Sequence, residues 1–218
     1  MCFSATASFA AFGVLSILGL LSVRNAKTKQ QIPFAAIPFL FGIQQFCEGV
    51  IWLTQSHGLP VKPFLALGTY GFLMFAFLVW PVWVPFSLLL LEKDTKRKQI
   101  LAGLFGIGSI WALFVANFMI VSPITTSVVC CDHIQYLVGI GYPEWAILVY
   151  ALATILPFFV SSVRLMTAFG LLVLATFIGA YLIFSMVFIS VWCFFAAAIS
   201  ICVYWMVGVL PVSRGSSL

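Results

Sequence analysis

Charged side chains are scarce in this sequence. Only 7% of its 218 residues are Asp, Glu, Lys or Arg, whereas 64% are hydrophobic. In a soluble domain about a quarter of the residues are charged, because polar side chains cover its surface. This chain has too few of them to cover a surface in water, which excludes a soluble globular fold. The composition indicates a protein that folds in a lipid bilayer.

Histidine and metal-binding motifs are scarce as well. The two histidines, His57 and His133, both fall outside the long apolar stretches. This excludes a zinc centre built from three histidines within the membrane. Neither CxxC nor CxxCxxxH spacing occurs, so the usual cysteine motifs for zinc are missing. The last apolar stretch contains no lysine, which excludes a retinal Schiff base.

Seven apolar stretches are long enough to cross a bilayer, which takes about 20 helical residues. Backbone groups in hydrocarbon must bond within their own segment, so each stretch is expected to be a helix. The predicted spans are residues 4–23, 33–55, 64–91, 100–121, 145–163, 167–187 and 189–210. The sequence therefore predicts an all-α polytopic protein, a bundle of seven transmembrane helices in which residues 1–218 form a single domain. Pro81 and Pro85 predict a kink or steep tilt in the third span.

Basic residues distinguish the two sides of the membrane. One side carries Arg24, Lys27, Lys29, Lys93, Lys96, Arg97, Lys98, Arg164 and Arg214, and the other side carries only Lys62. Cytoplasmic loops are rich in Lys and Arg, which predicts an amino terminus outside and a carboxyl terminus in the cytoplasm. An odd number of spans fits this orientation. The net charge of +5 thus reflects topology, so the expected partner is the lipid bilayer and not a nucleic acid.

Glu48 is the only acidic residue within a predicted span. A carboxyl group in hydrocarbon is costly unless it is protonated, paired or hydrated, so such residues are candidate functional sites. Gln44 lies one helical turn before Glu48, and Trp52 lies one turn after it on the same face. We expect Glu48 to act as an acid, a base or a ligand. The alternative is a structural glutamate that bonds to a neighbouring helix.

Other polar side chains fall at the predicted depth of Glu48, in the outer half of the membrane. The expected ligand-binding residues are Gln44, Tyr70, Asn117 and Tyr150, and Ser185 and Cys193 lie at the same depth. Together with Glu48 they predict a polar pocket that opens outward. The loop 122–143 is rich in Thr, Val and Ile between Pro and Gly residues, which suggests a hairpin or re-entrant lid over this pocket. Ordinary contacts between membrane helices are the alternative for each polar residue.

Most cysteines map to the outer side or outer half: Cys2, Cys47, Cys130, Cys131 and Cys193. Thiols in an oxidising exterior tend to form disulfides. A disulfide between Cys2 and Cys193 is expected, or one that ties down the long loop through Cys130 or Cys131. A metal or redox site that combines Cys2, Glu48 and His133 is an alternative, in which His133 is a ligand or second proton carrier. A metal-ion cofactor is left open, as are unreactive thiols.

Three segments resemble a known family. They read Met-Cys-Phe-Ser-Ala-Thr-Ala-Ser-Phe at 1–9, Phe-Gly-Ile-Gln-Gln-Phe-Cys-Glu-Gly-Val-Ile-Trp at 41–52 and Ser-Val-Trp-Cys-Phe-Phe-Ala-Ala at 190–197. Over nearly its whole length the chain is similar to a bacterial family of multi-span membrane proteins, classed as a domain of unknown function. The resemblance implies a multi-pass protein of the bacterial cytoplasmic (inner) membrane and implies no activity.

Function is less constrained than architecture. The leading hypothesis is an outward-facing pocket around Glu48 that binds a small molecule, a lipid-derived group or a metal, with enzymatic activity left open. In a second hypothesis the protein is a transporter or channel for a small solute or proton, and Glu48 is the coupling carboxylate. A third is a structural or assembly role. Polar residues in both halves of the bundle would favour transport, whereas polarity confined to the outer half would favour an enzyme or receptor.

Overall fold

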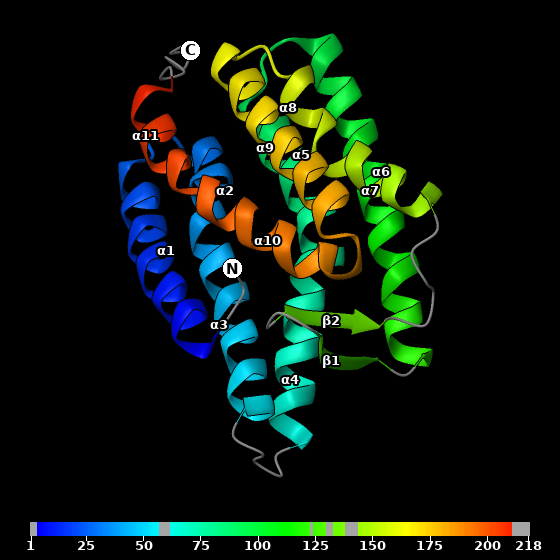
Figure 1. Ribbon diagram of the computed structural model, residues 1–218. Coiled ribbons are helices and arrows are strands. Elements are labelled where there is room, and N and C mark those ends of the chain that lie inside the picture. Colours follow the sequence, from blue (N-terminus) through cyan, green and yellow to red (C-terminus); the bar gives the residue numbers. More distant parts are fainter. Residues whose placement is uncertain (1–3, 57–61, 123, 130–132, 138–143, 211–218) are drawn as a thin grey trace.

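A computed structural model describes residues 4–56, 62–122, 124–129, 133–137 and 144–210. These residues form a bundle of helices and one two-stranded hairpin (Figure 1). The longer helices are α1 (Ala5–Asn25), α3 (Ile37–Ser56), α4 (Lys62–Leu73), α5 (Trp80–Leu91), α6 (Thr95–Val121), α7 (Glu144–Thr154), α9 (Arg164–Ile183), α10 (Phe188–Ile199) and α11 (Ile201–Val209). The shorter elements are η1 (Lys29–Gln31), α2 (Ile32–Ala35), η2 (Met74–Val79), α8 (Leu156–Val160), η3 (Ser185–Val187) and strands β1 (Thr125–Val129) and β2 (His133–Leu137).

The all-α class and the multi-pass character are confirmed. Within the described part of the chain, six helical units are long and apolar enough to cross a membrane. They are Ala5–Asn25, Lys29–Gln55, Lys62–Leu91, Thr95–Val121, Arg164–Ile183 and Ser185–Val209. Each corresponds to one of the predicted spans.

The predicted fifth span, residues 145–163, is divided. Helix α7 ends at Thr154, and α8 follows with Pro157 in its first turn. Proline has no N–H to donate within a helix, which favours a break at this point. Neither helix is long enough to cross a bilayer alone. A total of seven spans therefore stays a prediction.

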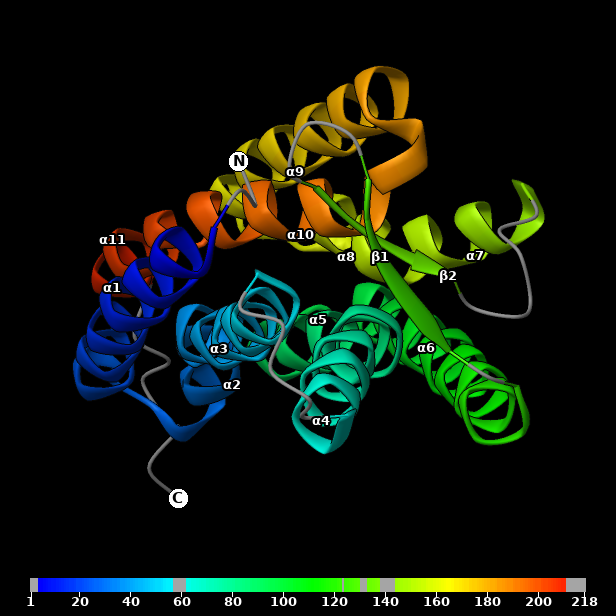
Figure 2. The ribbon, with the colours of Figure 1, turned by 60° about the horizontal axis from the view of Figure 1, so that its bottom comes forward.

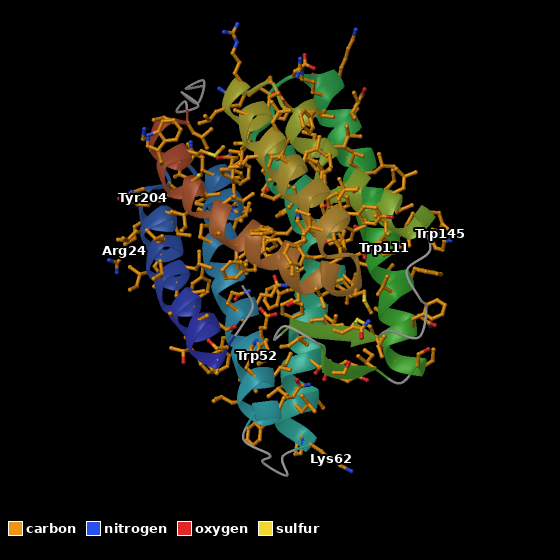
Figure 3. The ribbon with its side chains drawn as sticks, viewed as in Figure 1. Arg24, Trp52, Lys62, Trp111, Trp145 and Tyr204 are labelled. Carbon is orange, nitrogen blue, oxygen red and sulfur yellow. The ribbon has the colours of Figure 1, made fainter. Side chains whose placement is uncertain are left out.

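The two ends of the described chain lie at opposite ends of the bundle. The Lys27 side chain donates a hydrogen bond to the Gly208 carbonyl at 3.0 Å, which places the end of α11 beside the end of α1. The start of α1 lies at the level of the hairpin (Figure 1). Lys62 lies beyond the hairpin, at the far end from the carboxyl end of α11 (Figure 3). This separation agrees with the predicted topology, and which side is the cytoplasm stays a prediction.

Cysteine labelling of intact cells tests the predicted orientation. A membrane-impermeant maleimide should label a cysteine introduced at Thr125 in the hairpin, but not one introduced at Lys96 in the first turn of α6. Both proteins should be labelled equally after the membrane is permeabilised, which controls for accessibility. Labelling at position 96 in intact cells would contradict the orientation.

The two prolines of the third span are accompanied by a π-helical turn. Residues Met74–Val79 form this turn, and the Trp80 N–H donates to the Phe75 carbonyl, five residues earlier. Such a turn is frequent near prolines and near functional sites, because it rotates the residues that follow. Here it precedes Trp80, whose indole nitrogen reaches Gln44 of α3 at 2.7 Å.

Glu92 joins two loops at the end of the bundle where α11 ends. Its side chain is 3% exposed. The Glu92 carboxylate accepts hydrogen bonds from the backbone N–H of Lys93 at 2.8 Å and of Asp94 at 3.0 Å. It also accepts both the backbone N–H and the hydroxyl of Ser162, each at 2.7 Å. No pattern in the amino-acid sequence indicates this cluster, since a glutamate in a loop is ordinarily solvated.

Glu92 should make stability depend on pH. Burial acts to raise the pKa of Glu92, but the hydrogen bonds from Ser162, Asp94 and Lys93 outweigh it and lower this pKa from its ordinary value of 4.5. A carboxyl group with a lowered folded-state pKa stabilises the fold above its unfolded pKa, and this contribution is lost as the pH falls below about 4.5. As the pH falls, the stability measured by thermal unfolding in detergent should therefore decrease more steeply for the wild type than for Glu92→Gln. At pH 7 the variant should be less stable by about 2 kcal/mol, and superimposable pH profiles would contradict this account.

Candidate functional site

Glu48 lies at the contact between α3 and α10 and has no exposed surface. Its Oε1 accepts a hydrogen bond from the Ser190 hydroxyl of α10 at 2.7 Å. Its Oε2 accepts one from the Gln45 side chain at 3.2 Å. The carboxyl group is thus paired inside the bundle and does not face lipid, as the cost of a polar group in hydrocarbon requires. The hydrogen bond connects two helices through residues that are 142 positions apart in sequence.

Gln44 extends this polar cluster to the third span. Its Oε1 accepts a hydrogen bond from the indole N–H of Trp80 at 2.7 Å. Phe41, one turn earlier, stacks on Trp80 with ring centroids 3.9 Å apart. The side chain of Gln44 and the carboxyl group of Glu48 also lie within interaction range of the Cys193 thiol in α10. Polar contacts therefore join α3, α5 and α10 in the middle of an apolar bundle.

A cavity of about 240 Å³ lies beside the polar cluster and beneath the hairpin. Residues of η2, α6, β2, α7, η3 and α10 line it, and Figure 2 shows the hairpin crossing the space between α10 and α6. Most of the lining side chains are apolar or aromatic. Ser190 lines this cavity, and its hydroxyl also donates to Glu48. The Ser190 hydroxyl therefore connects the Glu48 carboxyl group to the cavity wall.

Two indole groups of the cavity wall have no hydrogen-bond acceptor within the described part of the chain. Trp111 of α6 (Figure 3) and Trp192 of α10 are each 6% exposed and line the cavity. Neither indole N–H has an acceptor among the described residues. A buried donor left without a partner destabilises a protein by about 1–3 kcal/mol. A cavity with such donors is suited to a molecule that carries an acceptor atom.

A second cavity of about 50 Å³ continues from the first toward the end of the bundle that holds Glu92. Tyr150, Trp192 and Cys193 line both cavities. The wall of the second cavity is nearly all apolar. Thr154 supplies the one aliphatic hydroxyl among the described residues of this wall, and it donates to the Tyr150 carbonyl at 2.8 Å.

The expected ligand-binding residues divide between the interior and the surface. Gln44 and Tyr150 are buried, and Tyr150 lines the cavity. Ser185 lines it as well. Tyr70 is 42% exposed and Asn117 is also exposed, so the structure does not bring these two to the cavity. The sequence gives the depth of a residue along its helix, but it does not give the direction in which the side chain points.

The predicted hairpin is present between α6 and α7. Strands β1 and β2 pair antiparallel, with Thr126 opposite Tyr136. Ile134 and Tyr136 are buried and line the cavity, which is the alternation expected of a strand with one face on the protein. Tyr136 also stacks on Phe72 with ring centroids 4.7 Å apart. Residues 134–137 of β2 all line the cavity, so this strand forms its outer wall.

The predicted disulfides concern residues that are largely outside the described part of the chain, namely Cys2, Cys130 and Cys131. The cysteines that the structure describes, Cys47, Cys193 and Cys202, carry free thiols. A pairing that involves the outer cysteines stays a prediction.

The predicted metal-binding or acid–base role of His133 concerns a side chain outside the described part of the structure. His133 begins β2, but its side chain lies outside the described residues, as does all of His57. No group of three His, Cys, Asp or Glu residues in the described chain could hold a metal ion. A site formed by Cys2, Glu48 and His133 stays a prediction.

One protein-family model matches residues 1–216 and is described as "Family of unknown function (DUF6629)". The chain belongs to DUF6629. The family resemblance of the three sequence segments is thereby confirmed, and the match includes both α3 with Glu48 and α10 with Ser190. No curated protein and no solved structure matches the chain. Membership in DUF6629 brings no activity, so the chemistry of the site has to come from its own residues.

Proposed function

We propose that this DUF6629 protein is a multi-pass protein of the bacterial cytoplasmic membrane that binds a small, mainly apolar, lipid-derived molecule in the cavity beneath the hairpin. The observation that carries the proposal is the combination of an apolar wall with the indole donor of Trp111, which has no acceptor among the described residues. Ligand sites are typically apolar with a few polar groups that fix orientation. Burial of hydrocarbon would supply most of the affinity, and the Trp111 indole would bind an acceptor atom.

The predicted topology places this cavity in the outer half of the membrane. The hairpin over it lies at the end of the bundle opposite the carboxyl end of α11 (Figure 1). Its ligand would therefore enter from the outer leaflet or from the exterior. The lipid bilayer is then the source of the ligand as well as the solvent of the protein.

The second cavity favours binding over transport of a polar solute or proton. A conducting path would need polar groups or water through both halves of the bundle. Toward the end that holds Glu92, the second cavity is lined by groups such as Phe158, Phe169 and Val173. The hydroxyl of Thr154, one of the described residues of this wall, already donates to the Tyr150 carbonyl instead of facing a solute.

The contact between Ser190 and Glu48 favours a second candidate function, an enzyme that acts on the bound molecule. A carboxylate that accepts a hydroxyl at 2.7 Å is within reach to remove its proton, and Gln45 orients the carboxylate from the other side. Glu48 would then be the base and Ser190 the nucleophile. In that case Ser190→Ala and Glu48→Gln would abolish turnover and retain binding.

A titration with a medium-chain fatty acid tests the binding proposal. Ala146 of α7 lines the cavity and is 6% exposed, so Ala146→Phe should fill the cavity. Leu148 of the same helix is 61% exposed, and Leu148→Phe is the matched control on the lipid face. In nanodiscs, saturable binding should weaken at least tenfold in Ala146→Phe and remain unchanged in Leu148→Phe. Equal binding by both variants, or no saturable binding by the wild type, would overturn the proposal.

A further inference from the structure

We infer that Trp192 sets the length of the hydrocarbon chain that the cavity accepts, because it closes the inner end of the cavity toward the second one. This inference rests on the proposed function and names its ligand class more closely. The ligand is a single-chain amphiphile with a hydrogen-bond acceptor in its head group, such as a fatty acid or its ester.

The order of residues along three elements shows how the two cavities are arranged. Ala76, Ala146 and Ser190 line the large cavity only. The residues that line only the small cavity come one or more helical turns later on the same chain segments, at Val84, Thr154 and Ala196. The small cavity is thus a continuation of the large one along the bundle. Only residues that line both cavities can close the passage between them.

Trp192 is the largest of the three residues that line both cavities, and aromatic side chains pack around it. It stacks parallel to Phe188 with centroids 5.9 Å apart and meets Phe177 edge-on at 5.0 Å. The ring of Tyr150 in α7 lies nearly perpendicular to the Trp192 ring, with centroids 5.5 Å apart. Its indole N–H has no acceptor among the described residues. Truncation of Trp192 therefore leaves no acceptor of the described residues without its donor, and it opens space between the cavities.

The polar groups of the wall determine which way a ligand lies. Gln135 of β2 and Ser185 of η3 line the large cavity on the side of the hairpin. The small cavity is lined by Phe158, Phe169 and other apolar residues. The binding free energy of an amphiphile is most favourable when its head group contacts the polar side of the cavity and its hydrocarbon chain points toward Trp192. The last methylene groups of the chain then meet the Trp192 ring.

Binding of a homologous series of fatty acids tests this inference. Each buried methylene contributes about 0.8 kcal/mol, or about a fourfold gain in affinity. Wild-type affinity should rise by this factor per methylene and then level off at the length that reaches Trp192. In Trp192→Ala the rise should continue for several further methylenes, and in Trp192→Phe for fewer. Trp205 of α11 is 60% exposed, so Trp205→Ala is the matched control and should keep the wild-type limit.

The outcomes separate the two proposals. No saturable binding of any chain by the wild type would overturn the proposed function. Saturable binding with the same length limit in the wild type and in a monodisperse Trp192→Ala or Trp192→Phe protein would overturn the role of Trp192 alone.

Discussion

Gly108→Ala is expected to destabilise the protein by about 3 kcal/mol or more, although it adds a single methyl group. A Cβ atom at position 108 of α6 would overlap the backbone carbonyl of Pro81 in α5. Neither backbone can move without displacing its whole helix. In a membrane such close contacts between helices replace the hydrophobic effect as the source of association, so their loss separates α5 from α6.

The sequence explains why this carbonyl approaches α6 so closely. In a regular α-helix the Pro81 carbonyl would accept the N–H of residue 85, but residue 85 is also a proline and has no N–H. The freed carbonyl can instead contact the Cα–H of Gly108, a weak hydrogen bond that recurs between closely packed helices. Any side chain at position 108 removes this contact.

Gly106→Ala on the same helix is the matched control. A Cβ at Gly106 meets nothing within 4 Å. Because alanine favours helix over glycine by about 1 kcal/mol, this variant should be as stable as the wild type or slightly more stable. Thermal unfolding in detergent, together with the monodisperse fraction after purification, measures both variants. Equal stability of Gly108→Ala and Gly106→Ala would contradict the close packing of α5 on α6.

Glu48→Ala is expected to have the next largest effect, a loss of about 3 kcal/mol. The substitution removes the acceptor of the Ser190 hydroxyl and of the Gln45 amide, which are both fully buried. Each buried donor without a partner contributes about 1–3 kcal/mol to the loss. Glu48→Gln retains an acceptor oxygen and the volume of the side chain, so it should lose less.

A double-mutant cycle with Ser190→Ala isolates the contact between α3 and α10. If the hydroxyl bonds to the Glu48 carboxyl group, the two substitutions should be non-additive by about 1 kcal/mol or more. Unfolding in detergent at pH 7 supplies the four free energies. Strict additivity would mean that the two side chains do not interact.

The sequence predicted the spans well, because backbone groups in hydrocarbon leave a long apolar helix as the only solution. The differences come from a polar helix start and from a proline. The fourth span was predicted from residue 100, whereas α6 begins at Thr95, since Asp94 caps it by accepting the Arg97 N–H at 2.9 Å. This first turn of α6 lies before the apolar stretch, so a prediction from hydrophobicity does not include it. The predicted span 145–163 is divided where Pro157 follows Thr154.

The site was predicted only in part. Glu48 and Gln44 were recognisable because a polar residue in an apolar stretch needs a reason, and both are buried in the polar cluster. Ser190 was not recognised, since a serine in a membrane helix is ordinary, and its partner lies 142 residues away. Asn117 had the expected depth but is exposed. The residues around Asn117 in α6 are apolar on all faces of the helix. The sequence therefore contains no stripe of polar residues that would identify the face packed against the other helices.

A density map of the protein purified in lipid nanodiscs tests the central claim most directly. The account predicts an elongated density in the cavity beneath the hairpin, which runs from Ser185 toward Trp192. A polar atom of that ligand should lie within hydrogen-bond distance of the Trp111 indole nitrogen. A map in which side chains of α10 and the hairpin fill this space, with no elongated density, would contradict it.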